Sequence, residues 1–348
     1  MMNVHKRLLA ILLVLVVVLM MPISAQANSL VAAMDDLYDQ YVISYMKNVM
    51  HSNVTIRSKS DVKNLNQEEC LIYYILNTEN GNGYVILDTE TLIIPECSLE
   101  STLPITVNDS IIYGGILTYL NKKSGAYYDI MSGKNVEIAT VSRMREMQEE
   151  NKQRVLTETE KIQRLESIRA SESVIRTVSG AGNSSWLFKS GRYYGDCGIN
   201  CIAMLEKYYD LYVNSNYLPS TLTTESQIKQ SINAYITNYT GFSTTLIDEN
   251  NLDDIISQHS YSLNTSHYLY ANTSTYSWST AVSKVTSNRP LAITIRNHPD
   301  FGYHYVIVCG YADTADLSTS RLYINSGWTD PGYVWIDQSY GYKQIPCV

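Results

Sequence analysis

The spacing of apolar residues predicts one buried helix in the second half of the chain. Residues 199–209 contain no helix breaker, and their apolar positions recur at i, i+3, i+4 and i+7, the spacing of one buried helical face. These positions are Cys201, Met204, Leu205 and Tyr208. Asp196 and Gly198 mark the start of the pattern, so we expect Cys197 at the helix N-terminus.

The rest of the C-terminal half has helical patterns first and strand patterns afterwards. Helical spacing covers residues 225–237, 252–259 and 277–287. Strand patterns cover residues 291–295, 304–311, 322–325 and 333–336. Short strands joined by turns favour antiparallel pairing, so residues 186–348 are expected to form an α+β domain with a helical part and an antiparallel sheet.

The N-terminal half reads as a second, smaller α+β domain over residues 28–140. A helix is expected from Leu30 to Met50, and a hairpin turn at residues 80–83. Strands are expected at residues 70–77, 83–88, 92–94 and 127–131. We find no pair of a nucleophile and a base in this part of the sequence.

A charged connector, residues 141–185, separates these two domains. Residues 141–172 lack Gly and Pro and predict an exposed helix with i, i+4 ion pairs, Glu150 with Arg154 and Glu160 with Arg164. The small residues at 177–185 predict a flexible boundary where the chain is processed.

Residues 1–27 have the pattern of a secretory leader. A basic start, His5 to Arg7, precedes an apolar run from Leu8 to Met21, and Ala25-Gln26-Ala27 forms an A-x-A cleavage site. The run is short for a membrane anchor, and no other segment is expected to span a bilayer. We therefore expect cleavage after Ala27 and an exported product, secreted or held at the cell surface.

Composition narrows the classes of function. Charged residues make up 17% of the chain and the net charge is −8, which argues against a nucleic-acid partner. Six cysteines are too few for a disulfide scaffold of this length, and a pair such as Cys70–Cys97 cannot be deduced from spacing. We see no metal-ligand spacing and no phosphate-binding loop, so neither a metal nor a cofactor is expected.

The residue types of a cysteine nucleophile and its base occur in order along the C-terminal half. A thiol at a helix N-terminus is expected to have a lowered pKa, although a lone cysteine there is more often structural. His304 opens a buried strand and is favoured as the base over His298, which lies in a turn. The turn between the strands is centred near residue 316, so the residue opposite His304 should fall near 328.

Asn325 is the expected partner of the histidine. Its side-chain oxygen would accept the Nδ1–H of His304, leaving Nε2 to take the thiol proton. Asp330 is a second candidate for this orienting role, and Trp328 is expected to shield the His304–Asn325 contact from water.

Three segments resemble the active-site segments of known peptidases. Residues 196–198, Asp-Cys-Gly, followed by Ala-Met-Leu at 203–205 and the tyrosines 208–209, resemble the active-site helix of C39-type and C39-like peptidases of the papain-like clan. Residues 304–311 are similar to their histidine strand. Residues 323–328 resemble the third catalytic segment of papain-like and streptopain-like enzymes.

The resemblance covers residues 186–340 and implies a papain-like fold with Cys197, rather than Cys201, as the nucleophile. Residues 83–88 followed by 94–96 resemble the propeptides of secreted papain-like bacterial peptidases. Papain-like enzymes carry a Gln shortly before the nucleophile, where it helps to stabilise the oxyanion. Residues 189–194 contain none, so Arg192, a Tyr hydroxyl or Asn183 would have to substitute for it.

The sequence therefore predicts a secreted cysteine peptidase that acts on peptides or proteins through a thioacyl intermediate of Cys197. Its own N-terminal domain is expected to act as an intramolecular inhibitor, so that the chain is made as a zymogen. Two alternatives stay open: a papain-like binding module at the cell surface with little or no activity, and a cell-wall amidase or transpeptidase with the same chemistry.

Overall fold

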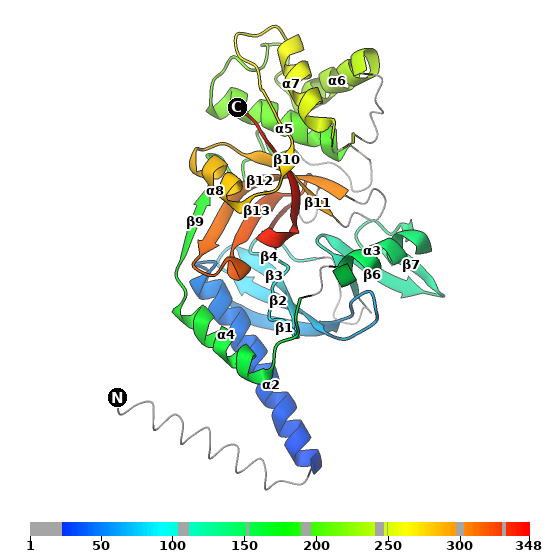
Figure 1. Cartoon of the computed structure of the whole chain (residues 1–348), viewed down its shortest axis with the longest axis vertical. Helices are drawn as coiled ribbons and strands as arrows, with labels where there is room; N and C mark the ends of the chain where they lie inside the picture. Colours follow the sequence, from blue (N-terminus) through cyan, green and yellow to red (C-terminus); the bar gives the residue numbers. More distant parts are fainter. Residues whose placement is uncertain are drawn as a thin grey trace.

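The computed structural model describes residues 23–103, 111–150, 153–188, 196–240, 247–248, 250–296, 303–328 and 332–348 (Figure 1). Most of the predicted leader lies outside these residues. Its last residues belong to helix α2 (Ile23–Asn48), which runs through the predicted cleavage site. Among the described residues, no helix is both long enough and apolar enough to cross a membrane.

The N-terminal half contains α2, four strands of a large sheet and a separate small sheet. The helix predicted from Leu30 starts earlier than expected, the short strand predicted at 92–94 lies at 96–98, and the hairpin turns at Glu79 and Asn80 because Thr78 pairs with Gly81. The strands of the large sheet are β1 (Thr55–Val62), β2 (Leu71–Thr78), β3 (Gly81–Asp88) and β4 (Glu96–Ser98).

The small sheet packs against helix α3 (Ile138–Glu150) around a core of its own that includes Val141 and Met144. Only the third of its strands was predicted from the sequence. These strands are β5 (Ile112–Gly115), β6 (Thr118–Lys123), β7 (Ala126–Asp129) and β8 (Asn135–Val136).

The connector is two helices rather than one exposed helix. After α3, helix α4 (Glu158–Ala170) begins with a capping box between Thr157 and Glu160. The predicted pair of Glu160 with Arg164 does not form, because Glu160 binds Arg154 over 2.6 Å and Arg164 donates to Ser318 over 2.7 Å. One side of α4 is buried against α2, so the connector is not a solvated spacer.

The C-terminal half follows the predicted order of helices and then antiparallel strands. Three strands were not foreseen: β9 (Ser173–Thr177), β10 (Ser274–Thr275) and β15 (Gly341–Pro346). The helices are α5 (Cys197–Tyr212), α6 (Glu225–Tyr235), α7 (Leu252–Ser262) and α8 (Trp278–Thr286). The predicted strands are β11 (Leu291–Arg296), β12 (Tyr303–Thr314), β13 (Arg321–Asn325) and β14 (Tyr333–Asp337).

One antiparallel sheet of eleven strands runs through both halves of the described chain. Its order is β1-β2-β3-β4-β14-β13-β12-β11-β15-β10, and β9 pairs with β12 beyond the end of β11. Helix α5 lies across the C-terminal strands in Figure 1. Its predicted apolar face is buried, with Cys201, Met204, Leu205 and Tyr208 each at most 1% exposed. All six cysteines are free thiols.

Candidate active site

Cys197 is the first residue of α5, and its thiol lies against the beginning of β12. The sulfur lies close enough to the backbone N–H of Tyr305, the residue that follows His304, for that group to stabilise its thiolate. The pairing of β12 with β13 ends where Ile307 stands opposite Asn325, whereas β12 itself extends back to Tyr303. The helix tip therefore meets β12 where its neighbouring strand has ended.

The thiol of Cys197 is not the low-pKa thiol that its helix position predicted. Its pKa is raised from 9.0 to about 11, chiefly because burial disfavours the thiolate, and the nearby carboxylate of Asp196 raises it further. Backbone N–H groups of Tyr305, Gly198 and Cys197 itself oppose this shift. The donors of the helix terminus are present, but the burial of the sulfur outweighs them, although Cys197 as a whole residue is half-buried.

His304 is held by a backbone carbonyl group and an indole ring. The residue is 2% exposed, its Nε2 lies 2.6 Å from the carbonyl oxygen of Ser326, and its ring stacks on Trp328 with centroids 4.0 Å apart. A carbonyl oxygen only accepts hydrogen bonds, so Nε2 carries a hydrogen, and in the neutral ring Nδ1 then carries the lone pair. This tautomer is the reverse of the one expected from the sequence, because the contact that orients the ring is on Nε2.

Asn325 shapes the turn that follows β13. Its Oδ1 accepts a hydrogen bond of 2.8 Å from the backbone N–H of Gly327. Continued past Ile307–Asn325, the β12–β13 register puts His304 opposite Trp328, the position estimated from the sequence. Asn325 therefore supports the turn whose Ser326 carbonyl oxygen contacts His304, and this carbonyl oxygen, instead of the predicted Asn325 side chain, orients the ring.

Asn200 was not predicted from the sequence. It lies one turn into α5, is 1% exposed, and points toward Gly327, where its amide nitrogen would be 3.8 Å from a Cβ atom placed on that glycine. The helix that carries Cys197 thus packs directly against the turn that holds His304. A polar residue three positions after Cys197, on a face that is otherwise apolar, was the available signal.

Two of the other predicted residues lie in the described part of the chain. Asn183 donates to the hydroxyl of Tyr212 at the far end of α5, about 22 Å from Cys197 by helical rise, so it cannot replace the missing Gln. Cys201 lies on the buried face of α5, beside Cys309, in agreement with the packing role expected for it. Arg192, His298 and Asp330 lie outside the described residues.

The comparisons with known proteins found one related family. Residues 185–343 match the family described as the Peptidase_C39 like family. This match, with the mixed helices and antiparallel strands, supports a C39-like, papain-like α+β fold for the C-terminal half, and the matched family suggests a cysteine peptidase. No curated protein matches the chain. Among the described residues, no group of three or more Cys, His, Asp or Glu side chains is placed to hold a metal ion.

Proposed function

We propose that this chain is a cysteine peptidase whose nucleophile is Cys197 and whose general base is His304. The observation that carries the proposal is the position of the Cys197 thiol beside the backbone N–H of Tyr305, the residue that follows His304, where that N–H opposes the rise in the thiol's pKa. A nucleophile beside a base that a third group orients is the arrangement that covalent catalysis requires. Here the third group is the carbonyl oxygen of Ser326.

The proposed reaction starts from a neutral thiol. The Nδ1 of His304 takes the proton from Cys197 as the sulfur attacks the peptide carbonyl carbon, and the backbone N–H of Cys197 donates to the oxyanion. The imidazolium then gives its proton to the departing amine, leaving a thioacyl enzyme. Water, deprotonated by the same Nδ1, releases the second product. Trp328 covers one face of the ring and keeps its orientation fixed.

The proposal extends to secretion and to a zymogen. The leader pattern at residues 1–27 supports export. The N-terminal half is proposed to restrain the peptidase half until the exposed loop at 182–185 is cut. Casein hydrolysis measured before and after a cut in this loop tests the restraint, and an unchanged rate would remove the inhibitor role while leaving the peptidase assignment intact.

Labelling with iodoacetamide, followed by peptide mapping, tests the nucleophile. We expect modification at Cys197 in parallel with loss of casein hydrolysis, and no hydrolysis by Cys197→Ala. Cys201→Ala is the matched control, because Cys201 is a buried packing residue on the same helix. An active preparation that stays unmodified at Cys197 would end the assignment. Peptidoglycan fragments offered in parallel separate a peptidase from a cell-wall amidase or transpeptidase.

A binding module without activity is the second candidate, and the raised pKa of Cys197 favours it. A thiol whose pKa is about 11 is almost entirely protonated at neutral pH, and residues 189–194 contain no Gln for the oxyanion. Hydrolysis that Cys197→Ala abolishes would exclude this candidate.

A further inference from the structure

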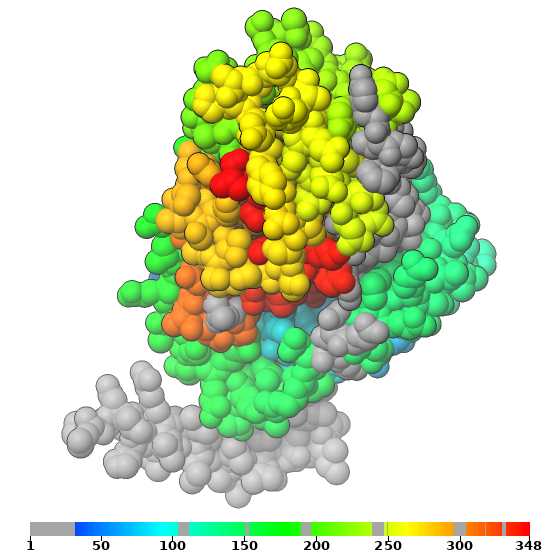
Figure 2. Space-filling model, turned by 45° about the horizontal axis from the view of Figure 1, so that its top comes forward, coloured from blue at the N-terminus to red at the C-terminus, as the bar shows by residue number. Residues whose placement is uncertain are grey.

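The two halves of the chain meet along a strand edge. β4 pairs with β14 through Cys97 opposite Trp335 and Glu96 opposite Ile336, and a further backbone hydrogen bond of 2.9 Å follows at Pro95. The N-terminal strands thus extend the sheet that carries the candidate active site. In Figure 2 the red and orange atoms of the C-terminal strands lie directly against cyan and green atoms of the N-terminal half. Separation would expose the unpaired backbone of β14.

Strand β9 forms a second β-ladder between the two halves. It precedes the exposed loop in the sequence. Residues 173–177 of β9 pair with residues 310–314 of β12, and the Val178 N–H donates to the Cys309 carbonyl oxygen over 2.8 Å. The exposed residues 182–185 come shortly afterwards. A cut in this loop would therefore leave β9 on the N-terminal fragment, still paired with β12 of the other fragment.

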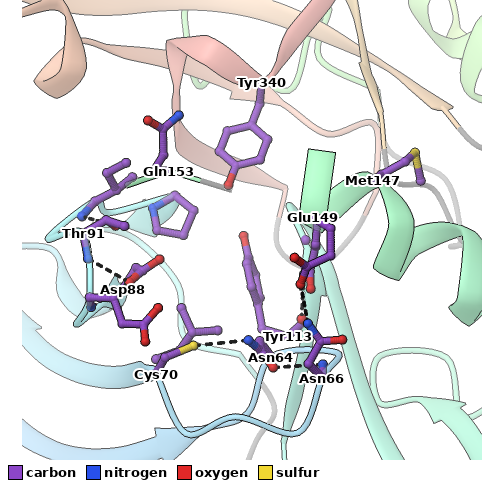
Figure 3. A pocket seen from close by; sticks show the side chains of 16 residues that line it. Asn64, Asn66, Cys70, Asp88, Thr91, Tyr113, Met147, Glu149, Gln153 and Tyr340 are labelled. Carbon is purple, nitrogen blue, oxygen red and sulfur yellow. Dashed lines mark hydrogen bonds between the residues drawn. The ribbon is translucent and has the colours of Figure 1, made fainter. Parts of the chain in front are cut away.

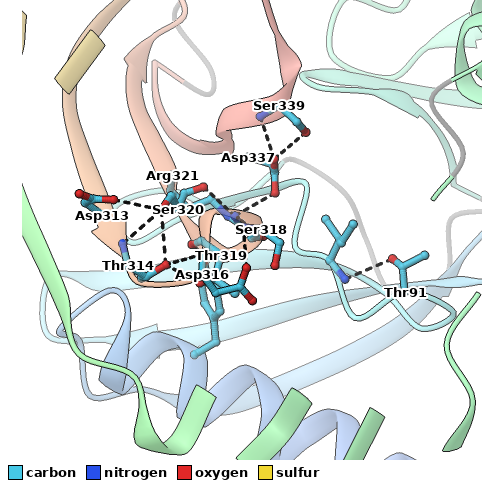
Figure 4. A network of polar contacts seen from close by, with 12 residues as sticks. Thr91, Asp313, Thr314, Asp316, Ser318, Thr319, Ser320, Arg321, Asp337 and Ser339 are labelled. Carbon is cyan, nitrogen blue, oxygen red and sulfur yellow. Dashed lines mark hydrogen bonds and ion pairs between the residues drawn. The ribbon is translucent and has the colours of Figure 1, made fainter. Parts of the chain in front are cut away.

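The surroundings of one buried charged residue, Arg321, also come from both halves. Arg321 of β13 is 1% exposed and donates to Asp337 over 2.9 Å, and its guanidinium group lies 5.2 Å from the ring centre of Tyr45 in α2. The Tyr45 hydroxyl donates to the Thr319 carbonyl oxygen over 3.2 Å. Figure 4 shows this Arg321–Asp337 pair among the polar side chains of residues 313–320, close to the blue helix α2. Departure of α2 would uncover the ion pair and remove its aromatic neighbour.

Tyr340 reaches from the C-terminal half into the N-terminal half. It lines a cavity of about 130 Å³ whose other lining residues all fall between 64 and 153. Figure 3 shows the ring of Tyr340 entering this cavity across from Tyr113 and Asn64. The contact between the halves is therefore reciprocal, because each supplies side chains that the other buries.

We propose that these contacts form a permanent interface of the peptidase half, and that its partner is the chain's own N-terminal half. Cleavage in the loop 182–185 then yields a protein of two chains that stay together, and the N-terminal half is a lasting subunit. A restraint that the cut relieves would therefore depend on the uncut loop and not on departure of the N-terminal half. The interface consists of the β4–β14 and β9–β12 ladders, the Arg321–Tyr45 contact and Tyr340. The proposal does not depend on catalysis, because each of these contacts lies outside the Cys197–His304 site.

The test uses the full chain with Cys197→Ala, so that the protein cannot cut itself. A recognition sequence for a site-specific protease is inserted after Ser184, the loop is cut, and the sample is applied to a gel-filtration column at ~1 μM. We expect one peak at the volume of the uncut protein, with both fragments present in it. Two separate peaks under native conditions would overturn the proposal. The cut sample run in concentrated guanidinium chloride shows that the column resolves the fragments.

Variants of Tyr45 test whether the assigned contacts hold the two fragments together. In the cut protein, Tyr45→Ala is expected to raise the dissociation constant of the two fragments on the order of 100-fold, because a buried aromatic ring is lost. Tyr45→Phe is the matched control, since it keeps the ring over Arg321 and loses only one hydrogen bond; about a fivefold increase is expected. Equal affinity of Tyr45→Ala and the parent would contradict the assigned interface.

Discussion

Two histidines of this protein are buried to the same degree, yet they lie in different chemical settings. His304 is 2% exposed and faces the end of β13, and His259 is 1% exposed among the helices α5, α6 and α7. His259 has its Nδ1 2.7 Å from Glu206 and its Nε2 3.0 Å from Ser231. His304 has a carbonyl oxygen on Nε2 and the Cys197 helix beside its strand.

The comparison shows that the residue types of a triad do not by themselves make an active site. Ser231, His259 and Glu206 have the order and the contacts of a serine-hydrolase triad. Ser231, however, lies in the middle of α6, where backbone N–H groups are bonded within the helix and cannot serve an oxyanion. Cys197 lies at a helix start, where such donors are available. The two sites therefore differ in whether backbone N–H donors are available beside the nucleophile. Matched variants of the two histidine sites test this difference.

The largest expected effect is on activity. His304→Gln is expected to lower kcat/KM for a peptide substrate on the order of 10³-fold, because the base is lost while the ring's volume is largely kept. His259→Gln should stay within about threefold of the parent, assayed well below its unfolding temperature. If His259→Gln lowered kcat/KM more than His304→Gln did, the catalytic site would instead be the cluster of Ser231, His259 and Glu206.

The next effect is on stability and concerns the other histidine. Glu206→Gln is expected to lower the free energy of unfolding by about 2 kcal/mol, because it weakens a buried 2.7 Å hydrogen bond between His259 and the Glu206 carboxyl group that joins α5 to α7. Chemical denaturation of this variant beside His304→Gln measures the contrast. Replacing both partners, Glu206→Leu with His259→Leu, should cost less than either single change, since no unpaired polar group is then buried.

The parts of the fold that depend on local pattern were predictable from the sequence. The apolar spacing from Cys201 to Tyr208 gave the buried face of α5, and counting outward from the turn near 316 placed residue 328 opposite His304. Each of these predictions needs only helix or hairpin periodicity. The predicted strand ends and the predicted hairpin turn at 80–83 differ by a few residues from the observed ones, and the turn lies at 79–80. Several neighbouring positions satisfy the same pattern.

The features that depend on distant parts of the chain were not predictable. The pKa of Cys197 follows from burial that many segments provide together, so the helix position alone gave the wrong direction. The partner of His304 is a backbone carbonyl group, which every residue carries and no sequence pattern marks. The pairing of β4 with β14 joins strands more than two hundred residues apart, and a three-residue strand leaves almost no signal.

A smaller effect is expected from the turn that holds His304. Gly327 has a φ of +73°, which disfavours any residue with a Cβ. Gly327→Ala is expected to lower kcat about tenfold, because relaxing the strain moves the Ser326 carbonyl oxygen away from Nε2. Gly182→Ala is the matched control: its φ is +83° and a Cβ there meets open space, so the strain is similar and kcat should not change.

The smallest effect concerns the charge beside the nucleophile. Because the native thiol of Cys197 has a pKa of about 11, its alkylation rate should rise with pH up to about 11 instead of levelling off in the neutral range. Asp196→Asn removes a carboxylate that raises this pKa, so the profile should move to lower pH and the rate at pH 8 should increase about threefold. The reaction is followed by peptide mapping, so that only Cys197 is counted. Asp210→Asn, near the other end of α5, is the control and should leave the profile in place. A rate that is already independent of pH near neutrality would mean that the base, and not burial, sets the thiol's ionisation, as it would in an ion pair with His304.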